Sequence, residues 1–202
     1  MTVDPSGRFA YAVNEDDATV SMFTIDSSTG ILTPTTPATV FTGPIPFAIT
    51  VDPSGKFAYA SNNDSGGLMT YGISQYTIDS VTGVLTQNNP PAVAAGNGPT
   101  SVAVDPSGKF AYVVNRSDNT ISMFIIDPGS GNLTPNEPAN IATGKQPWRI
   151  IIDPSGMFAY VTNQNSASVS IYKLNGDGTL TVAGTASTGN DPVSVDITRT
   201  AK

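Results

Sequence analysis

The sequence predicts an all-β fold built of four equal units, and three observations support this. A nine-residue phrase of the form Val-Asp-Pro-Ser-Gly-Lys-Phe-Ala-Tyr occurs four times, with successive Asp residues 48, 53 and 48 positions apart. Glycine (19) and proline (16) are plentiful and evenly spread, as a chain with many turns requires. A period near 50 residues with four short strands per period is typical of a β-propeller blade. The phrase occupies Val3–Tyr11, Val51–Tyr59, Val104–Tyr112 and Ile152–Tyr160.

The last complete unit shows each expected element in order. Trp148–Ile152 is apolar and predicts a first strand, which ends in the type I turn Asp153–Gly156, where Pro presets φ and Asp caps the backbone. Phe158–Thr162 is rich in aromatic and β-branched residues and predicts a second strand. Val169–Leu174 alternates as a third strand, and a fourth, outer strand begins at Leu180 after an Asn-Gly-Asp-Gly turn.

The same elements recur along the chain, which we interpret as a single domain over residues 1–202 with repeats of approximately 4–51, 52–104, 105–152 and 153–197. The second repeat is five residues longer, between Asn62 and Ile78. A Gly-x-x-Pro motif opens each first strand, at residues 43–46, 96–99, 144–147 and 189–192.

Both ends of the chain carry parts of a first strand. Thr2–Val3 matches the tail of one, and Val193–Ile197 matches a whole one. We therefore expect the C-terminal strand to complete the N-terminal blade. This closure could occur within one chain as a four-bladed ring, or between two chains as an eight-bladed homodimer, or the chain could be a fragment of a longer propeller. We favour the homodimer, because apolar two-sided blades with modest twist suit a wider ring than four.

Composition excludes several classes of function. The net charge is -7, the nine basic residues do not cluster, and no apolar run approaches a membrane span, so we expect no nucleic-acid partner and no membrane insertion. The chain has no Cys and no His, which removes disulfides, thiolate metal sites and the commonest general base. We expect no metal and no cofactor. No signal peptide is visible, yet the composition favours a periplasmic or secreted location, with a cytoplasmic one as the alternative.

The repeat also carries a family resemblance over essentially all 202 residues. The phrase at residues 104–115, the Thr-Ile-Ser-Met-Phe strand at 120–124 and the tetrad Tyr160-Val161-Thr162-Asn163 resemble the lactonase-type seven-bladed propellers, which include 6-phosphogluconolactonase-like, carboxymuconate-cyclase-like and Tyr-Val-Thr-Asn-repeat proteins. The resemblance implies a lactone-hydrolysing or cyclase activity with a His/Arg/Glu constellation on one face. This chain departs from the family by having four repeats, no His, and Glu only at positions 15 and 137.

Candidate site residues are those that differ between repeats on the face formed by the Gly-x-x-Pro loops. We predict ligand contacts there, because propeller loops over the central channel commonly bind ligands. An aromatic beside a guanidinium suits a sugar or an anionic small molecule. The alternative is that Trp148 packs between blades and Arg149 is a surface charge. The candidates are Trp148, Arg149, Arg116, Lys145 and Tyr71.

Two other patterns are interpreted as structural. The acidic run at residues 15–17 lacks the spacing of a dedicated calcium loop and is read as a solvated loop. The four repeated Asp residues lie on separate blades, so they cannot act as an acid/base pair, and the repeated Ser residues have no His. We predict no catalytic residues.

Two functions remain at this point. The first is a non-catalytic propeller that serves as a scaffold or binding module. The alternative is a lactone hydrolase acting at the loop face, with Arg116, Arg149 and Glu15 as its electrostatic and acid/base groups.

Overall fold

The computed structural model describes residues 1–63 and 72–197, and these residues form four antiparallel sheets of four strands each. Each sheet is one blade, with its strands in chain order from the innermost to the outermost. The predicted all-β propeller fold is therefore confirmed. The strands are β1 (Thr2–Val3), β2 (Phe9–Asn14), β3 (Thr19–Ile25) and β4 (Leu32–Phe41) in the first blade; β5 (Pro46–Val51), β6 (Phe57–Asn62), β7 (Ile73–Ile78) and β8 (Leu85–Val93) in the second; β9 (Pro99–Val104), β10 (Phe110–Asn115), β11 (Thr120–Ile126) and β12 (Leu133–Ala142) in the third; and β13 (Pro147–Ile152), β14 (Phe158–Asn163), β15 (Ser168–Leu174) and β16 (Leu180–Ser187) in the fourth.

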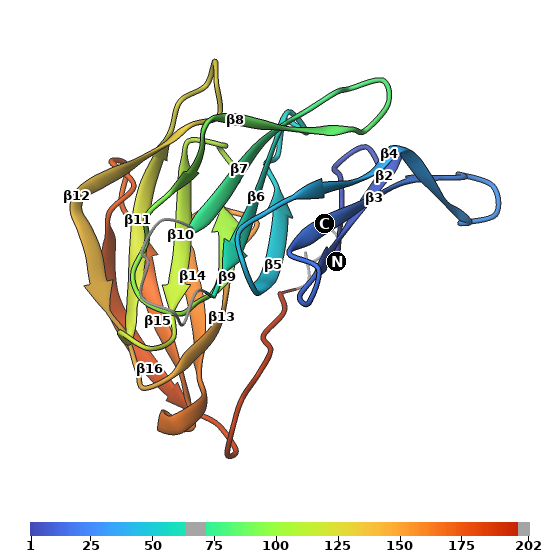
Figure 1. The fold of residues 1–202 in the computed structure, drawn as a ribbon. Coiled ribbons are helices and arrows are strands. Elements are labelled where there is room, and N and C mark those ends of the chain that lie inside the picture. The colour runs from blue at the N-terminus through green and yellow to red at the C-terminus, as the bar shows by residue number, and fades with distance from the viewer. Residues whose placement is uncertain (64–71, 198–202) are drawn as a thin grey trace.

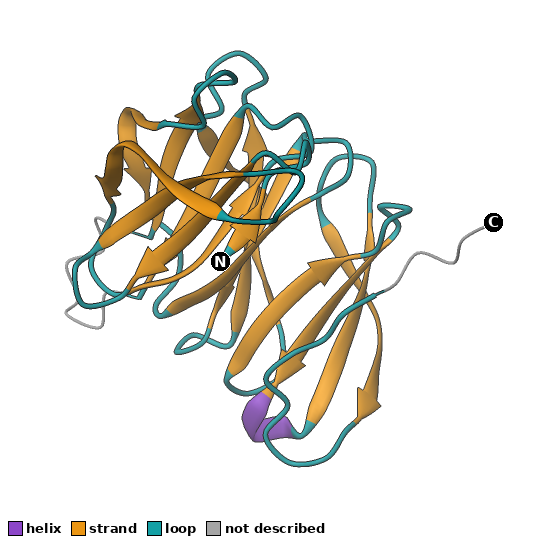
Figure 2. Cartoon of the chain, turned by 90° about the vertical axis from the view of Figure 1, so that its right-hand side faces the viewer, coloured by secondary structure: helices purple, strands orange, loops and turns teal. Residues whose placement is uncertain are grey.

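The blades follow one another in an arc (Figure 1). The innermost strands β5, β9 and β13 lie beside one another, and β1 lies beside β5. Figure 2 shows the same arrangement from the side, with the sheets stacked face to face rather than edge to edge. The inner strands therefore line the concave side of the arc, where a propeller has its channel.

The apolar core lies between the blades and is divided into three parts among the described residues. One cluster joins the first and second blades, another the second and third, and another the third and fourth. Each junction contains a fully buried tyrosine whose hydroxyl donates a hydrogen bond to a glycine carbonyl in the outer turn of the following blade. These bonds are Tyr11 to Gly83 (2.9 Å), Tyr59 to Gly131 (2.8 Å) and Tyr112 to Gly178 (3.0 Å).

The repeated Asp-Pro-Ser-Gly turns are held by the Asp side chain. The Asp52 carboxylate accepts hydrogen bonds from the backbone N–H groups of Ser54, Lys56 and Phe57 at 3.0, 2.9 and 2.8 Å, and from the Ser54 hydroxyl. The same pattern recurs at Asp4, Asp105 and Asp153, so the repeated acid is structural in every blade.

Opposite these turns, an Asn ends each second strand, and in the second and fourth blades its buried side chain holds the loop that enters the blade. Asn163 donates from Nδ2 to the Ser170 hydroxyl (2.9 Å), and its Oδ1 accepts from the Thr143 hydroxyl (3.1 Å). Asn62 accepts in the same way from Thr42 (2.8 Å). These bonds hold the Gly-x-x-Pro loops of the second and fourth blades against the ends of the second strands. The loops and these strand ends therefore lie on the same face of the blades.

Closure of the ring within one chain, which was one of the three predicted alternatives, is not observed. Residues 193–197 form no strand, and the inner position of the first sheet is held by Thr2–Val3 alone. Among the described strands, the inner edge of β2 pairs only with Thr2 and Val3, so the C-terminal segment does not complete the first sheet within this chain. The loop before β15 also contains a 3-10 turn, Gln164–Ser166, that the sequence did not predict. No helix among the described residues is long and apolar enough to cross a membrane.

Candidate functional site

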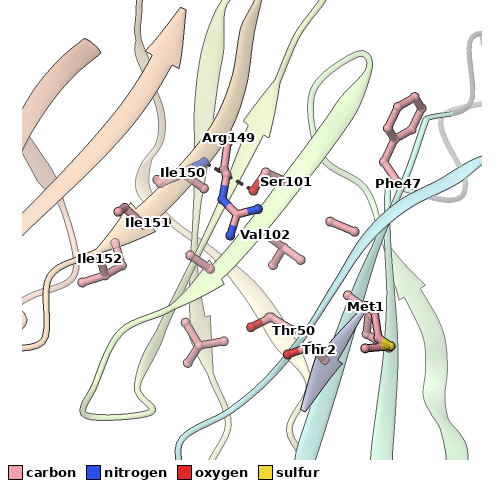
Figure 3. A pocket seen from close by; sticks show the side chains of 14 residues that line it. Met1, Thr2, Phe47, Thr50, Ser101, Val102, Arg149, Ile150, Ile151 and Ile152 are labelled. Carbon is pink, nitrogen blue, oxygen red and sulfur yellow. Dashed lines mark hydrogen bonds between the residues drawn. The ribbon is translucent and has the colours of Figure 1, made fainter. Parts of the chain in front are cut away.

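The concave side of the arc contains a hollow of about 370 Å³, formed by the inner strands of all four blades. Its walls are mostly small or aliphatic side chains and backbone. Among its described lining residues, Arg149 is the one charged side chain (Figure 3). The lining comprises Met1 and Thr2, residues 47–50, residues 101–104 and residues 149–152.

Arg149 projects into this hollow from β13 (Figure 3). Its backbone N–H donates to the Thr162 hydroxyl at 3.2 Å, which fixes the strand at this point. Within the described part of the chain, its guanidinium has neither a hydrogen-bond acceptor nor an ion-pair partner. An unpaired guanidinium in a pocket without a carboxylate is suited to an anion, which it can bind through two parallel hydrogen bonds.

A β-bulge explains why Arg149 points inward. The pairing of β13 with β14 shifts register between Pro147 and Arg149, so Trp148 is an extra residue and the alternation of side chains changes there. The second blade has the same bulge between Pro46 and Ala48.

The aromatic side chains at the two bulges, Phe47 of the second blade and Trp148 of the fourth, are in contact. The rings of Phe47 and Trp148 are 5.6 Å apart, edge to face, with an interplanar angle of 86°. The Thr100 hydroxyl of β9 donates to the Trp148 carbonyl at 2.9 Å, which holds the two inner strands together. Trp148 thus packs between blades, as the alternative interpretation of this residue proposed. Of the two aromatic residues, Phe47 lines the hollow and Trp148 does not.

Arg116 lies on the other side of Trp148. Its guanidinium carbon is 5.3 Å from the indole centroid, and its nitrogens donate to the side-chain oxygens of Gln146 (3.0 Å) and Gln164 (3.3 Å). Arg116 is therefore already engaged with groups of its own chain and does not line the hollow.

The other predicted residues are not brought together with Arg149 by the described contacts. Lys145 is exposed on its loop, where its backbone N–H donates to the Ser166 hydroxyl at 2.8 Å. Glu15 is exposed on the loop after β2 and is absent from the lining of the hollow. Tyr71 lies outside the described residues. No group of three or more acidic side chains that could hold a metal ion occurs within the described ranges.

Sequence reasoning missed Phe47 and the two glutamines that hold Arg116. Phe47 occupies the same repeat position as Trp148, immediately after the Gly-x-x-Pro motif, so the signal was present. The glutamines carry no such signal, because their side chains meet Arg116 only through the packing of the third and fourth blades.

Comparison with known proteins places the chain in a family. Residues 1–91 and 79–197 match the family described as "Lactonase, 7-bladed beta-propeller". The chain belongs to this family. No curated protein has a matching sequence.

Several solved structures share the fold of this chain. A candidate 6-phosphogluconolactonase from Bacteroides fragilis is 24% identical, with 95% of this chain and 55% of that one covered and a TM-score of 0.77. A periplasmic gluconolactonase from Pseudomonas aeruginosa is 22% identical, with 94% and 54% covered and a TM-score of 0.75. A protein from Lactobacillus plantarum is 24% identical, with 95% and 55% covered and a TM-score of 0.78. The chain spans about half the length of these structures.

Proposed function

We propose that this lactonase-family chain is a non-catalytic binding module whose channel takes a small anionic ligand of the sugar-acid class. The observation that carries the proposal is Arg149, an unpaired guanidinium directed into a hollow in which the described lining includes no acidic side chain. A carboxylate or phosphate offers two oxygens to such a group and leaves no competing negative charge nearby.

The border of the hollow supports a ligand with a carbon ring or chain beside its charge. Phe47 presents aromatic surface next to the aliphatic walls, and Trp148 holds that ring in place through its edge-to-face contact. Sugar acids combine C–H surface, which packs on aromatic rings, with hydroxyls that can bond to the Ser101 and Thr50 side chains on the neighbouring inner strands.

The absence of acid/base groups favours binding over catalysis. Lactone hydrolysis needs a base to activate water, yet the sequence has no His and the described lining of the hollow has no Asp or Glu. Glu15 and Arg116, which the alternative enzyme would use, also lie outside that lining. Turnover by this chain would therefore require groups that do not border the hollow.

Calorimetric titration with 6-phosphogluconate, and with glucose as the neutral counterpart, tests the proposal. We expect saturable binding of the anion that weakens at least tenfold in Arg149→Ala, since a charge-assisted hydrogen bond contributes about 1.5–3 kcal/mol. Lys145→Ala removes an exposed positive charge outside the hollow and serves as the matched control, which should bind as the wild type does.

A parallel assay of 6-phosphogluconolactone hydrolysis separates the two functions. Binding without turnover above the uncatalysed rate, at high protein concentration, supports the binding module. Turnover that is lost in Arg149→Ala would support the lactonase alternative instead. Failure of both anion and lactone to interact would overturn the assignment of the hollow as a ligand site.

We further propose an extracytoplasmic location, on the basis of a chain without Cys and with few Lys residues. Fractionation of the source cells, with antibody detection of the native protein, tests this. Recovery in the cytoplasmic fraction alone would contradict it.

A further inference from the structure

A second hollow, separate from the channel, lies between the second and third blades on the loop face. Its volume is about 410 Å³, and it is formed by the chain between β8 and β9 together with β11 and β12. The first blade precedes this junction and the fourth follows it, so the hollow is internal to the array. Among its described lining residues, Asp118 is the one charged side chain.

The junction between the third and fourth blades shows which groups fill the equivalent place in the repeat. There, the Tyr172 hydroxyl donates to the Ala142 carbonyl at 2.8 Å, and the Thr143 hydroxyl donates to Oδ1 of Asn163 at 3.1 Å. Two hydroxyl groups thus satisfy one backbone oxygen and one buried amide oxygen.

The junction between the first and second blades contains the same pair of hydroxyls. Tyr76 donates to the Phe41 carbonyl at 2.9 Å, and Thr42 donates to Oδ1 of Asn62 at 2.8 Å. The arrangement is therefore a regular part of the blade, and its loss at one junction is a local change.

The third blade lacks both hydroxyls. Phe124 stands at the position of Tyr172, and Ala95 stands at the position of Thr143. The carbonyl of Ala94 and Oδ1 of Asn115 are the two oxygens that lose their donors. Asn115 is fully buried and its Oδ1 has no hydrogen-bond partner, whereas Ala94, Ala95 and Phe124 all line the hollow. The space left by the two hydroxyls therefore adjoins two acceptors and no replacement donor.

A carboxylate adds negative charge at the same place. Asp118 is exposed and stands where the fourth blade has Ser166. Its Oδ2 and Oδ1 accept from the backbone N–H (2.7 Å) and Nδ2 (2.9 Å) of Asn97, and each oxygen keeps a further lone pair. A Cβ at Gly96 would lie 2.7 Å from Cγ of Asn115 and 2.9 Å from Oδ2 of Asp118, so this glycine lets the amide and the carboxylate approach the floor together.

We propose that this hollow binds the primary ammonium group of a small amine, at a site separate from the one that contains Arg149. An ammonium has three donors and no acceptor, which matches a hollow that has lost two donors and gained a carboxylate. The Ala94 carbonyl, the Asp118 carboxylate and the Thr120 hydroxyl oxygen, which accepts one bond from Asn115 (3.0 Å), have lone pairs for it. Oδ1 of Asn115 lies beneath the floor and favours positive charge above it through its own partial charge.

The rest of the lining suits an organic cation better than a metal ion. Pro135 and Ala139 of the third blade offer apolar surface on which a short carbon chain can lie. Calcium takes about six to eight oxygen ligands, often from several carboxylates. No group of three or more acidic side chains lies close enough to hold a metal ion in the described ranges.

Nuclear magnetic resonance titration of the full chain with butylammonium chloride tests the proposal, with butanol as the neutral counterpart. We expect saturable amide shifts at residues 94–97 and 118–124 with the cation and none with the alcohol. Residues 149–152 of the channel should not shift, so the result is independent of the anion titration.

Two variants remove the site by different means. Phe124→Tyr restores the hydroxyl that donates to the Ala94 carbonyl, and it should weaken binding about tenfold or more without loss of fold. Phe23→Tyr makes the same change at the equivalent position of the first blade and should bind as the wild type does.

Asp118→Asn keeps an acceptor for the Asn97 backbone but removes the charge, so it should also weaken binding about tenfold or more. Asp17→Asn, at the equivalent exposed position of the first blade, is its matched control and should have no effect. Circular dichroism checks that each variant is folded.

Four results would overturn the proposal. Absence of shifts at residues 94–97 and 118–124 would mean that the hollow takes no amine. The same shifts with sodium or calcium chloride would assign it to a metal ion. Equal losses in Asp118→Asn and Asp17→Asn would reduce the effect to general surface charge. Undiminished binding by a folded Phe124→Tyr would show that the missing hydroxyl does not form the site.

Discussion

The turn face and the loop face of the blades differ in how far they repeat. On the turn face, the Asp-Pro-Ser-Gly phrase has the same hydrogen bonds in all four blades. On the loop face, the residue after the Gly-x-x-Pro motif is Phe47, Thr100 or Trp148, and the next is Ala48, Ser101 or Arg149. The repeated residues build the array, whereas the residues that change from blade to blade shape the hollow. Substitutions on the two faces should therefore affect different properties.

The largest effect is expected at a repeated junction. Tyr59→Ala removes a fully buried ring between the second and third blades and should lower the free energy of unfolding by about 3–5 kcal/mol. Tyr59→Phe keeps the ring and loses only the bond to Gly131, so it should cost about 1 kcal/mol. Chemical denaturation of both variants measures the difference. Equal losses would contradict the packing role of the ring.

Acid should weaken the repeated turns. Burial raises the pKa of Asp4. Hydrogen bonds from the Ser6 hydroxyl and from the backbone N–H groups of Phe9, Ser6 and Arg8 together lower the pKa by more than burial raises it, so it lies below its usual value. The pKa of Asp153 is lowered in the same way. Their contribution to stability is complete above the unfolded-state pKa of about 3.9 and is lost as the pH falls through the folded-state pKa.

Melting temperatures measured from pH 7 to pH 2 should therefore fall below about pH 4. Asp4→Asn should be less stable than the wild type at pH 7 and should lose less on acidification. A variant with the full acid dependence of the wild type would assign that dependence to other groups.

A smaller effect is expected where one blade departs from the others on the loop face. Asn115 is fully buried, and its Oδ1 has no hydrogen-bond partner. The threonine that donates to the equivalent Asn62 and Asn163 is replaced by Ala95 in the third blade. Ala95→Thr should supply the missing donor and raise the free energy of unfolding by about 1 kcal/mol.

The reverse change, Thr143→Ala, is the matched comparison and should cost a similar amount, because it leaves the Asn163 oxygen unpaired. Denaturation of the two variants side by side measures both changes. A destabilising Ala95→Thr would mean that the third blade has no space for the hydroxyl.

Sequence alone predicted most of the architecture, because its signals are local. The turn at Asp153–Gly156 and the entry loop before Pro147 depend on residues that determine their own backbone geometry. Residues 193–197 match a first strand in sequence but pair with no strand of this chain, because a strand needs an edge to pair with and the repeat pattern cannot say where that edge lies. The inward direction of Arg149 was equally inaccessible, because a bulge at Trp148 changes the alternation of side chains.

The candidate site was predicted only in part for the same reason. Trp148, Arg149 and Arg116 were selected as departures from the repeat, and the structure brings Trp148 into contact with Arg116. Which of these three residues lines the hollow depends on how the blades pack against one another, and the repeat pattern does not show this. Arg149 lines the hollow, and Arg116 is instead held by Gln146 and Gln164.

Arg149→Ala is expected to have the smallest effect on stability and the largest effect on binding. It therefore tests most directly whether the repeated turn face determines stability and the variable loop face determines binding. The measurement is the shift in Tm that saturating 6-phosphogluconate causes in the wild type and in Arg149→Ala. Without ligand, the free energies of unfolding of the two proteins should agree within the ±0.5 kcal/mol that is usual for substitutions of exposed side chains. With ligand at a hundredfold excess over the wild-type Kd, the free energy of unfolding of the wild type should rise by about 2–3 kcal/mol, and that of Arg149→Ala should rise by about half as much or less. A variant that melts well below the wild type, yet still gains the full ligand shift, would show that Arg149 supports the fold and not the site.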